Sequence, residues 1–240
     1  MQFVTDAIVL RRTDYRDYDR MVTLFSPEHG RIDAVARGCR RPKSALMNAS
    51  EVFCAGQFSL HEAGGRYSIT QCEIKDSFYD LRFDYDRLIH GMYYLSLADM
   101  AALPGQGAPD VFMLLLKALA HLCYSELPAE MLTASFEMRY MPMMGFMPSM
   151  DRCVVCGAPV DGPARFDEEL GGVVCDRCPS DAPRISQGAR RIIYKAPRTD
   201  YSVVPKLDGH PDWPEAARLY RPFVERRIER RFRQIVPDLP

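Results

Sequence analysis

Two pairs of cysteines constrain this 240-residue chain more than any other feature. The pairs are Cys153-Val-Val-Cys156 and Cys175-Asp-Arg-Cys178, and eighteen residues separate them. Two C-x-x-C turns at this distance match the spacing of four-thiolate zinc sites. Each turn brings two sulfurs onto one ion, and the second turn completes a tetrahedron with Zn–S distances of about 2.3 Å. The sequence therefore predicts a small ribbon that holds a structural zinc ion.

The segment between the two cysteine pairs is typical of a β-hairpin. Gly171-Gly172 provides a turn, and Gly157 and Pro179, which follow the two pairs, also suit tight turns. Disulfides are an alternative, but no signal peptide or membrane-spanning run directs the chain to an oxidising compartment. A redox-active C-x-x-C usually occurs once, near a βαβ pattern. Four thiolates leave no open position for water, which disfavours a catalytic zinc.

Composition indicates a soluble, globular protein with one or two domains. Hydrophobic residues make up 47% of the chain and charged residues 26%, a balance that excludes disordered and membrane-embedded classes. The cell interior is the expected location. The four remaining cysteines lie in apolar or mixed surroundings and are expected to be small buried side chains: Cys39, Cys54, Cys72 and Cys123.

The charges are distributed unevenly, although the net charge is only −1. Residues 1–50 contain nine Lys/Arg and six Asp/Glu, and residues 184–240 contain thirteen and seven. Residues 51–183 contain nine and nineteen. Basic ends therefore flank an acidic middle, and this asymmetry points to nucleic acid or another polyanion as a partner of the ends.

The first 76 residues have the pattern of short β-strands. Residues Arg31–Arg37 alternate between polar and apolar, as a half-buried strand does, and Ala63-Gly64-Gly65-Arg66 is typical of a hairpin turn. Five strands are expected, around Ala7–Leu10, Arg20–Phe25, Arg31–Arg37, Val52–Leu60 and Tyr67–Ile74. This pattern predicts a small barrel of the OB-fold type over residues 1–78, a fold that often binds single-stranded nucleic acid.

Helical periodicity begins after residue 78. Helices are expected over Asp86–Ala102, Pro109–Tyr124, Pro128–Met141, Gln187–Lys195 and Pro214–Gln234. Ser186 is a suitable N-cap for the fourth of these helices. The expected fold class is therefore α+β. An N-terminal OB-fold barrel is followed by an α-helical domain of residues 79–150 and 183–240, into which residues 151–182 insert the four-cysteine zinc ribbon.

A basic loop is expected between the third and fourth strands. The segment Ala36-Arg37-Gly38-Cys39-Arg40-Arg41-Pro42-Lys43-Ser44 contains four cations and no acidic residue. Arginine donates bidentate hydrogen bonds to phosphate oxygens, so such a loop on an OB-type barrel favours contact with nucleic acid. A charge run alone is more typical of a solvated loop, and this alternative stays open.

Together these motifs resemble the RecO family of bacterial recombination mediators. The resemblance rests on the basic loop, Asp6–Leu10, Asp17–Arg20, Phe25–Arg31 and the helical middle with its two C-x-x-C pairs, and it covers essentially the whole chain. It implies a protein that binds single- and double-stranded DNA, anneals complementary strands and acts with RecR. It further implies a role in loading RecA onto DNA coated with single-stranded DNA-binding protein, at the nucleoid in the bacterial cytoplasm, without enzymatic chemistry.

The resemblance also implies roles for particular residues. The implied phosphate contacts are Arg31, Arg37, Arg40, Arg41 and Lys43, and the implied Zn²⁺ ligands are Cys153, Cys156, Cys175 and Cys178. The helical region would bind the acidic C-terminal tail of single-stranded DNA-binding protein, with Lys117 and Arg139 as candidate cations at the edge of an apolar pocket. Tyr15, Tyr18 and Tyr67 are candidates for stacking on bases, and each is equally compatible with the core or the rim of the barrel.

Two other classes of function remain open. One is a protein-interaction adaptor without DNA contact, and the other is an accessory part of a nucleic-acid-modifying enzyme. The sequence has no G-x-x-x-x-G-K-[ST], G-x-S-x-G or H-E-x-x-H motif, which favours a protein that is not an enzyme. Arginines near the C-terminus would form a second DNA surface or, more commonly, the wet face of an amphipathic helix: Arg226, Arg227, Arg230 and Arg231.

Overall fold

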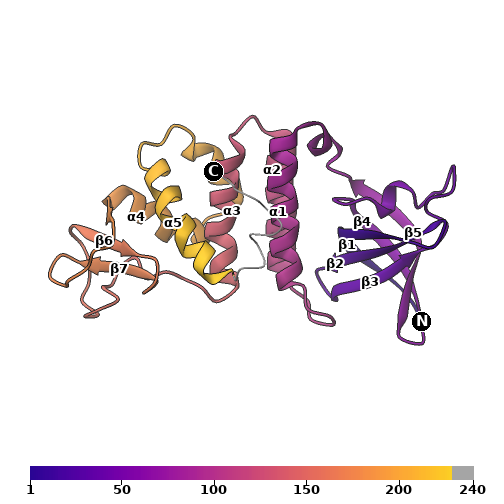
Figure 1. Ribbon diagram of the computed structural model, residues 1–240, viewed down its shortest axis with the longest axis horizontal. Helices are drawn as coiled ribbons and strands as arrows, with labels where there is room; N and C mark the ends of the chain where they lie inside the picture. The colour runs from indigo at the N-terminus through magenta and orange to yellow at the C-terminus, as the bar shows by residue number, and fades with distance from the viewer. Residues whose placement is uncertain (229–240) are drawn as a thin grey trace. The chain divides into compact units, whose positions relative to one another are not determined.

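The computed structural model describes residues 1–228, which fall into two compact units (Figure 1). The first unit comprises Met1–Ser125, and the second begins at Glu126. The first unit thus extends beyond the barrel and includes the first two long helices. The finer sequence-based division at residues 78, 150 and 182 stays a prediction.

A closed barrel forms the N-terminal part of the first unit. Its five strands are β1 (Gln2–Tyr15), β2 (Asp19–Ser26), β3 (Gly30–Ala36), β4 (Ala55–Ala63) and β5 (Arg66–Asp76). They follow one another around the barrel in the order β1-β2-β3-β5-β4, and β4 pairs with β1. All neighbours are antiparallel except β3 and β5, which run parallel. The predicted OB-like barrel is confirmed.

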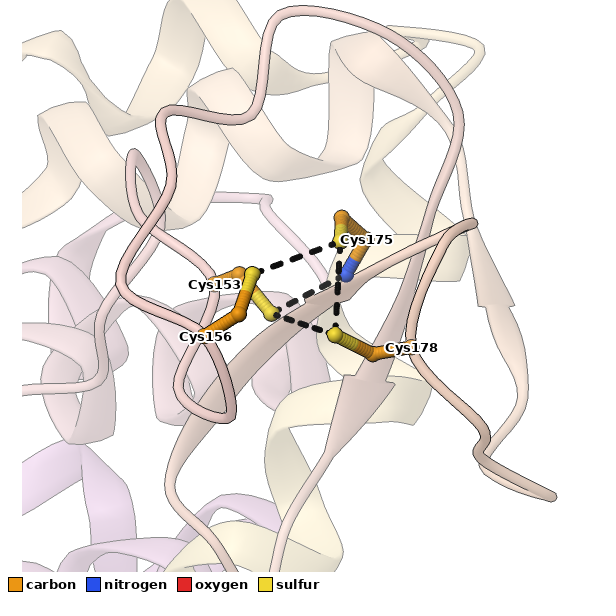
Figure 2. Close-up of side chains that lie close together, drawn as sticks. All are labelled: Cys153, Cys156, Cys175 and Cys178. Atoms are coloured by element: carbon orange, nitrogen blue, oxygen red, sulfur yellow. Dashed lines mark hydrogen bonds between the residues drawn. The ribbon is translucent and has the colours of Figure 1, made fainter.

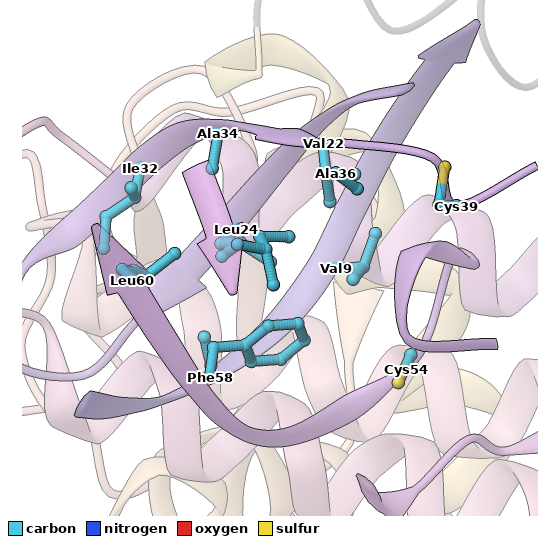
Figure 3. Close-up of a cluster of buried hydrophobic side chains, with 12 residues drawn as sticks. Val9, Val22, Leu24, Ile32, Ala34, Ala36, Cys39, Cys54, Phe58 and Leu60 are labelled. Atoms are coloured by element: carbon cyan, nitrogen blue, oxygen red, sulfur yellow. The ribbon is translucent and has the colours of Figure 1, made fainter. Parts of the chain in front are cut away.

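The interior of the barrel is filled by inward-facing side chains from every wall (Figure 3). Along β3, alternate residues are buried, and they place Ile32, Ala34 and Ala36 in the same cluster as Phe58 and Leu60 of β4. Among the cysteines outside the ribbon, the expected burial is found for Cys39 and Cys54, whereas Cys72 and Cys123 are partly exposed.

The strands extend beyond the apolar runs in the sequence. β1 continues through the exposed residues Arg11–Tyr15, because their backbone stays paired with β2, for example Arg12 with Val22. An apolar run detects only the buried part of a strand, so an exposed strand end gives no signal.

Two helices complete the first unit. These are α1 (Tyr85–Ala101) and α2 (Pro109–Tyr124), and short 3-10 helices lie at η1 (Asn48–Ser50) and η2 (Tyr79–Phe83). The side chain of Asp84 caps α1 by accepting a hydrogen bond from the N–H of Arg87 at 3.1 Å. α2 packs on the barrel through Phe112, whose ring centroid lies 5.6 Å from that of Phe25 on β2.

Up to residue 228, the second unit contains three α-helices and a small sheet. Its elements are α3 (Ala129–Met143), β6 (Ala164–Asp167), β7 (Gly172–Cys175), β8 (Arg184–Ile185), α4 (Gln187–Lys195), η3 (Ala196–Arg198), η4 (Tyr201–Leu207) and α5 (Trp213–Arg227). The sheet has the order β7-β6-β8. Ser186 caps α4 as predicted, because its hydroxyl accepts a hydrogen bond from the N–H of Ala189 at 3.0 Å.

α3 is buried on nearly every side, although its sequence contains charged residues. Two of these charged residues have partners inside the unit. Glu137 accepts a hydrogen bond from Arg221 of α5 at 2.9 Å. Arg139 donates to the carbonyl oxygens of Thr199 and Asp200. A buried charge is tolerated when it is paired. The burial of these charged residues could therefore not be predicted from their polarity.

α5 begins one residue before the predicted start and ends at Arg227. The rest of the predicted C-terminal helix, including Arg230 and Arg231, lies outside the described residues. Among residues 1–228, no helix combines the length and the apolar character that a membrane span needs.

The barrel wall leaves no room for a side chain at Gly56. A Cβ atom there would lie 2.3 Å from the carbonyl oxygen of Glu73 on β5. Backbone on a paired strand cannot move aside, so Gly56→Ala should lower the free energy of unfolding by about 1–3 kcal/mol. Urea denaturation measures this loss. Gly162→Ala is the matched control, because no atom lies within 4 Å of the added Cβ, and equal stabilities for the two variants would contradict the prediction.

Candidate zinc centre and nucleic-acid interface

Two tight turns and one strand end bring the four cysteines together. Cys153 and Cys156 lie in the loop before β6, where the N–H of Gly157 donates to the carbonyl of Cys153 at 2.8 Å. Gly157 has a φ of +72°, which favours glycine because a Cβ is strained there. Cys175 is the last residue of β7, and a backbone hydrogen bond of 3.0 Å from Cys178 to Cys175 closes the second turn.

The four sulfurs face one another (Figure 2). Sulfur–sulfur distances are 3.9 Å between Cys153 and Cys178, 3.8 Å between Cys156 and Cys175, and 3.7 Å between Cys175 and Cys178. A tetrahedron with Zn–S distances of about 2.3 Å has edges of about 3.8 Å. A disulfide requires sulfurs about 2.05 Å apart. The cluster therefore has the dimensions of a four-thiolate zinc site and not those of two disulfides.

Backbone N–H groups favour the thiolate form of two of the four cysteines, Cys153 and Cys175. Burial opposes ionisation of Cys153, but donors at Cys175, Cys156 and Val155 outweigh it and lower the pKa of Cys153 to about 6. The N–H of Arg177 likewise lowers the pKa of Cys175. Because the thiolate is the form that binds metal, these donors prepare the cluster for a cation.

The hairpin of the ribbon is fastened to α5. The carboxylate of Glu168 in the β6–β7 turn lies 3.6 Å from Nε of Arg226, and Nη1 of Arg227 donates to the carbonyl of Glu168 at 2.8 Å. The ring centroids of Phe166 and Phe223 lie 6.2 Å apart beneath these contacts. Arg226 and Arg227 thus contact the ribbon, which favours the structural alternative for these two arginines.

The basic loop of the first unit is held by its backbone. Gly38, at a φ of +63°, donates its N–H to the carboxylate of Asp19 at 2.7 Å. The N–H of Arg40 donates to the carbonyl of Tyr18 at 3.0 Å, and Cys39 is buried in the barrel core. These contacts fix the loop against the β1–β2 turn and leave its cationic side chains outside.

The structure gives the five predicted phosphate contacts different surroundings. Arg37, Arg40, Arg41 and Lys43 are exposed on the loop. Arg40 lies 3.5 Å from Asp14, and the guanidinium of Arg41 lies 5.2 Å from the ring centroid of Tyr18. Arg31 instead lies at the opposite end of β3, where its guanidinium is 3.1 Å from Asp33 and 3.7 Å from Asp99. Arg31 is therefore the least available of the five cations.

A groove of about 930 Å³ runs along the barrel beside the loop. Its lining includes Arg16, Arg37 and Arg66 together with Tyr15 and Tyr67. It also includes acidic side chains, Asp19 and Asp33. Arg37 is one of the predicted phosphate contacts, whereas Arg16 and Arg66 were not predicted from the sequence. Arg66 belongs to a predicted hairpin turn and Arg16 lies between two predicted strands, so cations in the connections of the barrel were the available signal.

The other candidates from the sequence are scattered. Tyr15 and Tyr67 line the groove, and Tyr18 carries Arg41 on its ring. Lys117 is exposed on α2. Arg139 is buried and bonded to backbone carbonyls, so it does not supply a cation at the edge of an exposed pocket.

The barrel, the helical unit and the thiolate cluster define an OB-like α+β protein that carries a four-cysteine ribbon. Two family models match the chain: "Recombination protein O N terminal" over residues 1–78 and "Recombination protein O C terminal" over residues 82–234. The chain therefore belongs to the RecO family of DNA repair proteins.

Curated relatives agree with this assignment, and each is named "DNA repair protein RecO". The protein of Moorella thermoacetica is 27% identical over 96% of this chain and 88% of its own length. That of Desulforamulus reducens is 30% identical over 95% and 90%. That of Symbiobacterium thermophilum is 36% identical over 77% and 75%.

The cysteine cluster predicts one zinc ion per chain. Cys175→Ser removes one of the four thiolates and should abolish stoichiometric zinc and lower the unfolding temperature, because zinc binding in such modules contributes on the order of 10 kcal/mol to folding. Elemental mass spectrometry and calorimetry measure both effects. Cys123→Ser, outside the cluster, should keep its zinc. A Cys175→Ser protein with full zinc content would contradict the four-thiolate site.

Proposed function

We propose that this protein is a recombination mediator that binds single- and double-stranded DNA through its barrel and anneals complementary strands. The observation that carries the proposal is the group of exposed cations on the loop beside the groove, in a chain of the RecO family. The structural zinc ion would fold the ribbon and take no part in annealing. The protein would act in the bacterial cytoplasm, at the nucleoid, without catalysing bond formation.

The proposed mechanism is electrostatic. Repulsion between two phosphate backbones slows the pairing of complementary strands. Arg37 and Arg40 present planar guanidinium groups that match phosphate oxygens, while Tyr15 and Tyr67 in the groove offer ring faces to unpaired bases. Strands whose phosphate charges are neutralised reach a higher local concentration at the barrel. Bases that are not stacked on the tyrosine rings remain free to pair with the complementary strand.

We further propose that the protein acts with RecR and helps to load RecA onto DNA coated with single-stranded DNA-binding protein. Membership in the RecO family supports this role. The acidic tail of single-stranded DNA-binding protein would bind to the helical region. Arg139 is buried and donates hydrogen bonds to the carbonyl oxygens of Thr199 and Ser135. The pocket that binds this tail would therefore use other cations.

An adaptor without DNA contact is the rival, and salt dependence separates the two. Binding to single strands weakens with log salt at a slope of about −0.7 per neutralised phosphate. Four exposed loop cations predict a slope of about −3, and Arg40→Gln with Arg41→Gln should halve it and slow annealing. Fluorescence anisotropy with a labelled oligonucleotide gives the slope. Arg31→Gln should change it less, because Arg31 faces Asp33 and Asp99. Binding without any salt dependence would favour the adaptor.

The groove provides an independent test of the same proposal. Arg16→Gln with Arg66→Gln should weaken single-strand binding by about tenfold and reduce the slope by roughly 1.4, as expected for two lost phosphate contacts. The loop stays intact in this variant. A full loss of slope in the loop variant, with no change in the groove variant, would restrict the interface to the loop.

A further inference from the structure

The segment between the barrel and α1 exposes three large aromatic side chains. Tyr79, Phe83 and Tyr85 are 58%, 74% and 78% exposed. Soluble monomers rarely leave such side chains uncovered together. The rings of Tyr79 and Phe83 meet edge to face, with centroids 5.2 Å apart. Two of the three exposed rings therefore pack against each other on the surface.

The backbone holds these rings outward. Phe78 has a left-handed φ of +43°, and its N–H donates to the carboxylate of Asp76 at 2.8 Å. The conformation buries the ring of Phe78 and turns the chain into η2, which begins with Tyr79. A strained, hydrogen-bonded residue of this kind persists only where its surroundings hold it. The exposure of Tyr79 therefore follows from the fold.

Three aspartates are close neighbours of these rings in the sequence. Asp80, Asp84 and Asp86 are all exposed, and Asp80 makes no ion pair with any of residues 1–228. We name the three rings and these three aspartates the acidic aromatic ridge. Carboxylates repel phosphate, so the ridge is unsuited to DNA although its rings could stack on bases. Aromatic faces beside carboxylates suit a guanidinium, which stacks on rings and forms bidentate ion pairs.

The first unit already contains this mode of contact. The guanidinium of Arg82 lies 5.4 Å from the ring centroid of Tyr79 while it donates hydrogen bonds to backbone carbonyls. Arg41 of the basic loop rests in the same way on Tyr18. Arginine on an aromatic ring is thus a contact that this surface already makes with one of its own residues.

We propose that the acidic aromatic ridge binds the basic loop of a second copy of this chain. Charge complementarity supports this occupant, because the loop exposes four cations and the ridge exposes three carboxylates. Asp84 and Asp86 each have one basic neighbour, Arg87 at 3.5 Å and His90 at 3.9 Å, and Arg40 lies 3.5 Å from Asp14. Asp80 is therefore the ridge carboxylate most available to a cation of another copy. Within one copy, none of these four cations pairs with a ridge aspartate in the described part of the chain. The contact joins different patches of two molecules and is therefore head-to-tail. DNA competes for the same loop, so an oligonucleotide should dissociate the copies.

Sedimentation velocity on the full-length protein tests the contact. The wild-type protein should associate with increasing concentration at about 50 mM salt, and association should weaken at about 500 mM because exposed ion pairs are screened. Asp80→Asn with Phe83→Ala should weaken it by about tenfold or more. The matched control, Asp110→Asn with Met113→Ala, also removes one exposed carboxylate and one exposed apolar side chain, and it should associate like the wild type.

Mixing two defective variants distinguishes this contact from any other. Arg40→Gln with Arg41→Gln loses the loop but keeps the ridge, and the ridge variant keeps the loop. Each should be monomeric alone, and an equimolar mixture should form a complex of one copy of each. A wild-type protein that stays monomeric at low salt, or a mixture that does not associate, would overturn the proposal. Loss of oligonucleotide binding in the ridge variant would overturn it as well, since the ridge would then be a DNA surface.

Discussion

The short parallel pairing between β3 and β5 is the interaction on which the candidate DNA interface depends. It joins Ala34–Ala36 to Tyr67–Ile69 and closes the barrel. Because the last residues of β3, Ala34–Ala36, pair with residues near the start of β5, the point where the basic loop begins lies beside the β4–β5 turn. Arg37 and Arg66 therefore line one groove although the sequence separates them. A shift of this register would separate the two arginines, so the interface is a consequence of how β3 and β5 are paired.

The ribbon of the second unit depends on a different constraint. Its sheet has strands of four, four and two residues, too few to bury a core that would stabilise a fold alone. A zinc ion held by the four cysteines, whose sulfurs lie at the separations of a zinc tetrahedron, would replace that core. Contacts of Phe166 and Glu168 with α5 attach the ribbon to the helices. Metal binding would thus act together with helix packing to stabilise the ribbon.

Features that are local in sequence could be predicted, and features that need a distant partner could not. The spacing of the cysteines and the bounds Pro109–Tyr124 of α2 follow from neighbouring residues alone. The burial of Glu137 requires Arg221, which lies 84 positions away. Arg16 and Arg66 line the same groove only because the barrel closes, which their sequence neighbours do not reveal. The exposure of the ridge rings gives no signal in the sequence, because it follows from the path of the chain after the left-handed residue Phe78.

Arg31 and Arg41 show why net charge is a poor guide to the partners of this chain. Both are arginines near the barrel surface, but Arg31 has two carboxylates within 4 Å and Arg41 has the ring of Tyr18. A carboxylate pair occupies the donors that a phosphate would use, whereas a ring supports the guanidinium and leaves its N–H groups free. At physiological salt, charges more than about 8 Å apart are screened, so the acidic middle of the sequence does not cancel the loop. The cations that matter are those whose immediate neighbours leave them unpaired.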